Sequence, residues 1–205
     1  MRIEDLSQME NKKNDIVVRF EDGSKMNVSV AQIADYSLYS GRELTDDEYA
    51  SLREELELSS SKARAMRILG SRNYSTSEME RRLVSKGETS ETAKETVQWL
   101  EGIGALNDGE YAAAIVQSYN AKGYGLARIK DELYRRGIPR EMWDDALSSL
   151  GDMNDAAYDF IGKKLGGSRD KTDIRRATDA LCRRGFSYEE ARSIVIRYLE
   201  SIEES

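Results

Sequence analysis

The side chains of this sequence that could do chemistry are mainly those of lysine and arginine. The 205 residues include 31 Lys+Arg and 38 Asp+Glu, but no histidine and a single cysteine, Cys182. Histidine is the usual general base near neutral pH, and protein zinc sites are commonly built from cysteine and histidine. A lone cysteine without histidine also lacks the base that activates a thiol nucleophile. We therefore expect a protein that is not an enzyme, with no catalytic residues, no metal and no cofactor.

Two groups of cations could instead contact a polyanion. The span 163–184 holds eight Lys/Arg against three Asp, a local charge of +5. A second group, Lys86, Arg136 and Arg184, occupies one position of a sequence repeat, directly before a glycine. Cations there could stabilise the last turn of a helix through its dipole, by about 0.3–1 kcal/mol each. They could equally contact phosphates, which position a nucleic acid without reading its sequence.

The repeat that carries these cations aligns on Gly87, Gly137 and Gly185, which are 50 and 48 residues apart. In each copy apolar residues four apart precede the glycine, as Met79 and Leu83 do in the first copy. This spacing predicts a helix of about ten residues, and glycine suits the left-handed residue that closes such a helix. Favoured N-cap residues lie eight residues before the shared leucine. They are Ser75, Gly125 and Asp173.

Each copy is expected to contain two further helices. One follows the glycine and is marked in the second copy by Pro139 and in the third by the capping box Ser187–Glu190. The other precedes the aligned helix and begins with Asn-Asp-x-x-Tyr at Asn107 and at Asn154. The predicted fold class is therefore mainly α, with three tandem three-helix repeats stacked into an elongated, curved array. The predicted repeats cover residues 59–106, 107–153 and 154–205.

Residues 1–58 differ from the rest in charge and in pattern. They hold 7 Lys/Arg and 14 Asp/Glu, a charge of −7, whereas residues 59–205 hold 24 of each. Alternating apolar and polar residues flank Asp22-Gly23, which is a strong β-hairpin signal. The residues expected on the strand faces are Val17, Met26, Val28 and Val30. Because the capping box Thr45–Glu48 then starts an amphipathic helix, we expect a small acidic module of hairpin and helix.

Other residues allow both a functional and a structural interpretation. Lys122–Ile129 is glycine-rich, but it lacks the Lys-Ser/Thr and the preceding strand of a phosphate loop, so Gly125 is better explained as a helix N-cap. Tyr74 and Tyr124 share a repeat position and are either hydrophobic staples, which we favour, or base-stacking platforms. Cys182 falls at a repeat position occupied by Val84 and Tyr134 in the other copies, and the equivalent valine favours a packing role.

Three segments of the repeat region form a distinctive set. They are "YSTSEMERRLVSKG" from Tyr74, "ALNDGEYA" from Ala105 and "KGYGLARIKDELYRRGI" from Lys122. Together they resemble the RecX family. The resemblance covers about residues 60–200, and the N-terminal hairpin is similar to the extension of longer family members. It implies a non-enzymatic inhibitor of the recombinase RecA, acting in DNA repair, recombination and the SOS response. Such a protein binds the RecA–DNA filament and restrains its ATP hydrolysis, strand exchange and co-protease activity.

Carried onto this sequence, the resemblance implies a binding surface for the RecA filament and DNA that is made of cations. They are Lys86, Lys122, Arg128, Lys130, Arg135, Arg136, Lys163, Lys164, Arg175, Arg176, Arg183 and Arg184. Single- or double-stranded DNA is expected as a partner mainly through the filament, because residues 59–205 have no net charge. A stand-alone DNA-binding regulator of helix-turn-helix type is the alternative. No apolar run is long enough for a membrane helix, and we expect a cytoplasmic monomer.

Overall fold

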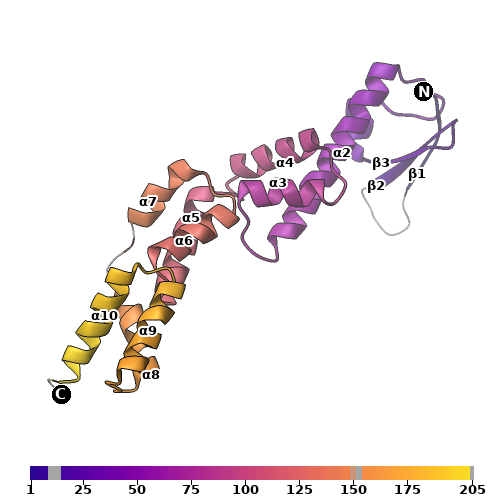
Figure 1. The fold of residues 1–205 in the computed structure, drawn as a ribbon. Helices are drawn as coiled ribbons and strands as arrows, with labels where there is room; N and C mark the ends of the chain where they lie inside the picture. Colours follow the sequence, from indigo (N-terminus) through magenta and orange to yellow (C-terminus); the bar gives the residue numbers. More distant parts are fainter. Residues whose placement is uncertain (9–14, 149, 151–153, 204–205) are drawn as a thin grey trace. The chain divides into compact units, whose positions relative to one another are not determined.

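The computed structural model describes residues 1–8, 15–148, 150 and 154–203, and the chain forms two compact units (Figure 1). The N-terminal unit consists of Met1–Gly70 and Leu83–Trp99, and the C-terminal unit of Ser71–Arg82 and Leu100–Ser205. Most of the described residues are helical, which confirms the predicted mainly α fold class. Among these residues, none of the helices is long and apolar enough to cross a membrane.

The N-terminal unit contains an antiparallel sheet with strand order β1-β2-β3 (Figure 1). Its strands are β1 (Ile3–Gln8), β2 (Asp15–Phe20) and β3 (Lys25–Ser29). β2 and β3 pair across a turn in which Gly23 has a φ of +82°, so the predicted hairpin is confirmed. β1 is absent from the sequence prediction. Val30 does not lie on a strand face as expected: it is 58% exposed and begins helix α1 (Val30–Asp35), which Ser29 caps.

Helix α2 (Asp46–Leu69) begins at the predicted capping box. The Thr45 hydroxyl accepts from the Glu48 amide at 3.2 Å, and the Glu48 carboxylate accepts from the Thr45 amide at 3.0 Å. Leu52 on this helix joins the buried cluster of the sheet, which includes Val18 and Phe20. The helix then continues without a break past residue 58, where the sequence analysis places a module boundary. That boundary stays a prediction, and one helix belongs to both sides of it.

The repeat region forms a series of short helices, as predicted. Their bounds are α3 (Thr76–Val84), α4 (Ser90–Gly102), α5 (Asp108–Ala121), α6 (Leu126–Arg135), the 3-10 helix η1 (Arg140–Met142), α7 (Trp143–Ser148), α8 (Asn154–Leu165), α9 (Lys171–Arg183) and α10 (Tyr188–Ser201). The aligned helices α3, α6 and α9 are each followed by the predicted glycine with positive φ: +99° at Gly87, +71° at Gly137 and +94° at Gly185. Separate buried clusters form between α5, α6 and α7 and between α8, α9 and α10.

The N-terminal caps of the aligned helices agree with the prediction in two repeats. The Ser75 hydroxyl accepts from the Glu78 amide at 3.0 Å, and Gly125 is the N-cap of α6 without a side-chain bond. In the third repeat the cap is Asp170 rather than Asp173. The Asp170 carboxylate accepts from the amides of Thr172 at 2.7 Å and Asp173 at 3.3 Å, so Asp173 lies in the first turn of α9.

Consecutive repeats of the C-terminal unit meet at the ends of their aligned helices. The end of α9 contacts the start of α6, where the Gly125 amide donates to the Arg184 carbonyl at 2.9 Å and the Ala127 amide donates to the Gly185 carbonyl at 3.2 Å. The first amides and the last carbonyls of a helix have no partner within that helix. These bonds therefore satisfy both helix ends at once.

The end of α6 contacts the start of α3 in the same way, but through side chains. The Ser75 hydroxyl donates to the Arg136 carbonyl. Asp108, which is buried at the start of α5, accepts from the amide and from the hydroxyl of Thr76 at 2.8 Å each. Asn107 caps α5 by accepting from the Glu110 amide at 3.1 Å. The Asn-Asp pair thus starts one helix and fastens it to the preceding repeat.

Glycine at position 125 is required by the close approach of α9. Its φ is −82°, which any residue adopts, but an added Cβ would lie 2.5 Å from the Gly185 carbonyl carbon and oxygen. We predict that Gly125→Ala lowers the free energy of unfolding by about 1–3 kcal/mol, because the two helix ends must move apart. Urea unfolding followed by circular dichroism measures this change.

The matched control is Gly102→Ala. A Cβ on Gly102, the last residue of α4, meets nothing within 4 Å. This variant should be as stable as the parent or slightly more stable, since alanine favours a helix over glycine by about 1 kcal/mol at most. Equal stability of Gly125→Ala and the parent would contradict the close-contact explanation.

Candidate functional site

The cations of the predicted binding surface all lie among the described residues. Ten are exposed, and two, Arg136 and Arg184, are half-buried. Lys86 belongs to the N-terminal unit, and the other eleven belong to the C-terminal unit. The repeated position before the glycine is therefore not uniform, since it is exposed in the first repeat and partly covered in the second and third.

Arg136 binds carboxylates on both sides of the junction between α6 and α3. Its Nε lies 2.7 Å from Glu132 Oε1, and its Nη1 lies 3.2 Å from Glu78 Oε1. Glu78 is also held by Arg72, with nitrogen–oxygen distances of 3.1 and 3.2 Å. The side chain of Glu132 is only 3% exposed, so Arg136 neutralises a buried charge.

These contacts change the proton affinity of Glu132. Burial by itself raises the pKa of this carboxyl, but hydrogen bonds from Arg135, Arg136 and Tyr119 outweigh it and lower the pKa to about 2. The same carboxylate raises the pKa of Arg136. Both groups are charged throughout the physiological range, and the network is a fixed structural feature rather than a source of acid–base chemistry.

Arg184 fastens the third repeat to the second. Its Nη1 donates to the Lys122 carbonyl at 2.6 Å, and its guanidinium lies 3.7 Å from the ring centre of Phe160 and 5.0 Å from that of Tyr124. The turn between α5 and α6 is thereby fixed to the end of α9. Arg136 and Arg184 thus share a role between repeats that their sequence pattern does not indicate.

Lys86 differs from its two repeat equivalents. It is exposed, and its carbonyl accepts from Arg64 Nη1 on α2 at 2.9 Å. No earlier repeat precedes it, so an arginine of α2 takes the place that Ser75 and Gly125 occupy at the later junctions. Its ammonium group makes no hydrogen bond or ion pair with any described residue.

Two pairs of exposed arginines occupy equivalent positions on α6 and α9. Arg128 and Arg135 are seven residues apart, as are Arg176 and Arg183, and residues so spaced lie on one side of a helix. Arg135 pairs with Glu132 at 2.6 Å, and Arg176 is 3.7 Å from Asp173. Arg128 and Arg183 make no side-chain hydrogen bond or ion pair with the described part of the chain. The structure thus presents the same exposed pair in two consecutive repeats.

The two tyrosines proposed as staples or stacking platforms have covered rings. The guanidinium of Arg72 lies 3.7 Å from the centre of the Tyr74 ring. The Tyr124 ring lies 5.1 Å from that of Tyr119 and also contacts Arg184. Cys182 is half-buried and packs against the cluster of α8, α9 and α10, as expected for a packing residue.

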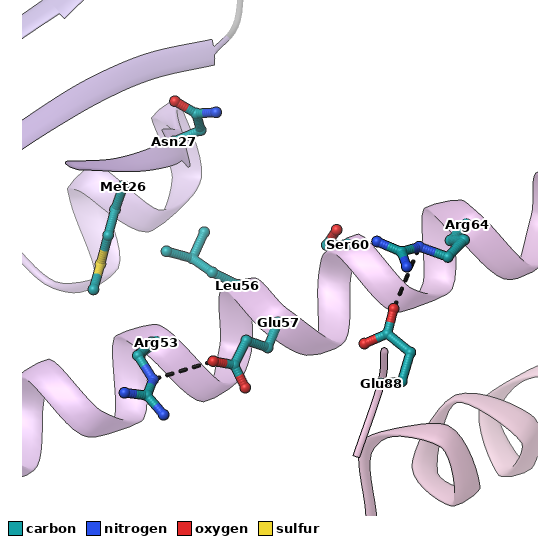
Figure 2. Close-up of a pocket in the computed structure, with 8 residues that line it drawn as sticks. All are labelled: Met26, Asn27, Arg53, Leu56, Glu57, Ser60, Arg64 and Glu88. Atoms are coloured by element: carbon teal, nitrogen blue, oxygen red, sulfur yellow. Dashed lines mark ion pairs between the residues drawn. The ribbon is translucent and has the colours of Figure 1, made fainter. Parts of the chain in front are cut away.

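A pocket in the N-terminal unit lies between β3, α2 and Glu88 (Figure 2). Met26 and Leu56 give it apolar walls. Figure 2 shows that its two carboxylates pair within the pocket, Glu57 with Arg53 at 3.1 Å and Glu88 with Arg64 at 3.4 Å. Within the described residues, no group of three or more His, Cys, Asp or Glu is placed to hold a metal ion. The pocket therefore offers paired charges and no reactive group.

These features define a class of protein: a helical-repeat protein whose prominent surface feature is repeated exposed cations. Two family models match the chain, the first three-helix domain of RecX over residues 62–100 and the second three-helix domain of RecX over residues 107–147. The chain belongs to the RecX family of regulatory proteins, as its sequence resemblance predicts.

Relatives and solved structures agree with this assignment. The regulatory protein RecX of Xanthomonas oryzae is 35% identical over 126 residues, which cover 60% of this chain and 79% of that protein. That of Stenotrophomonas maltophilia is 32% identical over 132 residues, covering 63% and 81%. A crystal structure of regulatory protein RecX aligns over 98% of both chains with a TM-score of 0.73 at 18% identity. RecX from Lactobacillus salivarius aligns over 70% of this chain and 97% of its own, with a TM-score of 0.63 at 23% identity. The two structures show a shared fold.

The lowered pKa of Glu132 predicts an acid-sensitive part of the stability. Because the pKa is lower in the folded chain, this contribution is complete above about pH 4.5 and is lost as the pH falls toward 2. Glu132→Gln should remove this part of the pH dependence, which amounts to about 2–3 kcal/mol. Urea unfolding of parent and variant from neutral to acidic pH measures it. If both proteins lose stability in parallel, Glu132 does not contribute in this way.

Proposed function

We propose that this protein is a non-enzymatic modulator of the recombinase RecA. It binds the RecA–DNA filament and restrains ATP hydrolysis, strand exchange and co-protease activity. Membership of the RecX family supports this proposal. The filament is the principal partner, DNA is contacted mainly within it, and the protein acts in the cytoplasm as a monomer.

The observation that carries the proposal is the repetition of exposed arginines on α6 and α9. Arg128 and Arg135 of the second repeat correspond to Arg176 and Arg183 of the third. A filament of identical protomers on a regular polyanion offers acidic groups that also recur, and repeated cations suit such a partner. The proposed surface further includes Lys86, Lys122, Lys130, Lys163, Lys164 and Arg175, all of which are exposed.

Arg136 and Arg184 have a different place in this proposal. Their guanidinium groups already bind the preceding repeat, and they are half-buried. Removing either would leave a junction without its cation, so a loss of activity could not be read as a lost contact with a partner. We assign them to positioning the repeats and leave them out of the test of the surface.

The alternative, a regulator of helix-turn-helix type, fits the helix ends less well. A recognition helix contacts base edges with its N-terminal residues. At the start of α6 the amides of Gly125 and Ala127 are bound by the end of α9, and the start of α3 is bound by Asp108. The exposed Arg135 and Arg183 lie at the other end of their helices. These contacts favour a modulator that binds along its helices.

The test combines Arg128, Arg135, Arg176 and Arg183 in one quadruple alanine variant. The DNA-stimulated ATPase of RecA is measured while the parent or the variant is titrated in. The parent should inhibit at micromolar concentration, and the variant should require about tenfold more protein or greater, since each exposed charge contact contributes about 0.5–1 kcal/mol. The inhibition by the variant should also depend less on salt.

A second quadruple variant is the control for lost charge. It replaces Arg2, Arg19, Lys25 and Arg53, which are exposed cations of the N-terminal unit, and it should inhibit like the parent. Equal inhibition by the first variant and the parent would exclude the α6 and α9 surface. A parent that leaves the ATPase unchanged, but shifts a duplex in a sequence-selective manner in a gel, would support the alternative.

A further inference from the structure

Tyr134 is the most exposed tyrosine among the residues that the structure describes. It lies on α6 and is 70% exposed, compared with 65% for Tyr188 and 61% for Tyr39. Its side chain makes no hydrogen bond, ion pair or ring contact with any described residue. The rings of Tyr74 and Tyr124, by contrast, are covered by arginine. The ring of Tyr134 is therefore open to contact by a partner.

The surroundings of Tyr134 on α6 are basic. Lys130 lies one turn before it, Arg135 follows it directly, and Arg128 lies nearer the start of the helix. These three side chains are exposed, and Asp131 is the exposed carboxylate among them. Lys130 and Arg128 make no side-chain hydrogen bond or ion pair with described residues. Arg135 is already paired with Glu132 at 2.6 Å, so Lys130 is the nearby cation on α6 whose charge is available to a partner of the ring.

The other two exposed tyrosines lack this combination. Tyr39 belongs to residues 1–58, which carry a charge of −7. Tyr188 is followed directly by Glu189 and Glu190, both exposed. In the first and third repeats the equivalents of Tyr134 are Val84 and Cys182, so the arrangement is particular to the second repeat.

We infer that Tyr134 is a stacking platform for an unpaired base of single-stranded DNA, with Lys130 contacting a flanking phosphate. Aromatic rings beside cations bind single strands in this way, because every base has a face that stacks and every linkage carries a charge. A duplex keeps its bases inside the helix and would satisfy the cation alone. The inference rests on the proposed function only for the presence of a DNA strand, and it adds the residue and the mode of contact.

The experiment measures binding of the full chain to two labelled strands of equal length, an oligothymidylate and a strand of abasic residues, by fluorescence anisotropy over a range of salt. Tyr134→Ala should weaken binding to oligothymidylate by about fivefold or more and leave the salt dependence unchanged, since stacking is not ionic. On the abasic strand this variant and the parent should bind equally. Tyr134→Phe keeps the ring and should bind oligothymidylate within about twofold of the parent.

Two further variants separate the ring from the charge. Lys130→Ala should weaken binding to both strands and lower the slope of affinity against salt by about 0.7, the value for one phosphate contact on a single strand. Tyr188→Ala removes a ring of similar exposure and should bind like the parent. Since both rings are exposed, the variants should unfold at the same urea concentration as the parent.

The inference would be overturned if the parent did not bind oligothymidylate, or if Tyr134→Ala bound it as tightly as the parent. It would also be overturned if Tyr134→Ala lost as much affinity for the abasic strand as for oligothymidylate, or if Tyr134→Phe bound as weakly as Tyr134→Ala. Inhibition of the RecA ATPase, measured on the same proteins, keeps the two proposals apart. A parent that inhibits RecA without Tyr134-dependent strand binding would disprove only the stacking role. Strand binding that depends on Tyr134, with no effect on the ATPase, would disprove only the proposed function.

Discussion

The structure of the C-terminal unit depends on hydrogen bonds between the helix ends of consecutive repeats. A helix leaves its first amides and last carbonyls without internal partners. Here the carbonyls at the end of one aligned helix accept from donors at the start of the aligned helix in the preceding repeat, from Ser75 in one case and from Gly125 in the other. The aligned helices are thereby joined end to start, and at the junction of α9 with α6 the close approach of the two backbones requires Gly125.

The two junctions reach the same geometry by different chemistry. The contact between α9 and α6 uses backbone hydrogen bonds and an arginine that lies over aromatic rings. The contact between α6 and α3 uses hydroxyl and carboxylate side chains and the ion pairs of Arg136. Arg136 and Arg184, at one repeated position, therefore hold the repeats together, whereas other cations of α6 and α9 are exposed to solvent. A count of charges along the sequence does not distinguish structural cations from exposed ones.

Much of the fold could be predicted from the sequence, because its signals are local. The hairpin turn at Asp22-Gly23, the capping boxes and the glycines that close α3, α6 and α9 depend on residues within a few positions of each other. The tertiary roles of the arginines could not be predicted: Arg184 bonds to a carbonyl 62 residues away, and Arg136 to a carboxylate 58 residues away. The exposure of Tyr134 could not be predicted either, because Val84 and Cys182 occupy its position in the other repeats and favour a packing role there. The cap of α9 was misplaced by three residues, since Asp170 and Asp173 are both good capping residues.

The cap of α9 differs from those of the other aligned helices. At the start of α6 the cap is a glycine with no side chain, and the open amides receive the next repeat. At the start of α9 the Asp170 carboxylate already occupies the amides of Thr172 and Asp173. At the start of α3 the Ser75 hydroxyl does both, since it accepts from the Glu78 amide and donates to the Arg136 carbonyl of the next repeat. The three aligned helices thus begin with three different caps, and only the caps of α3 and α6 are shared with a following repeat among the described residues.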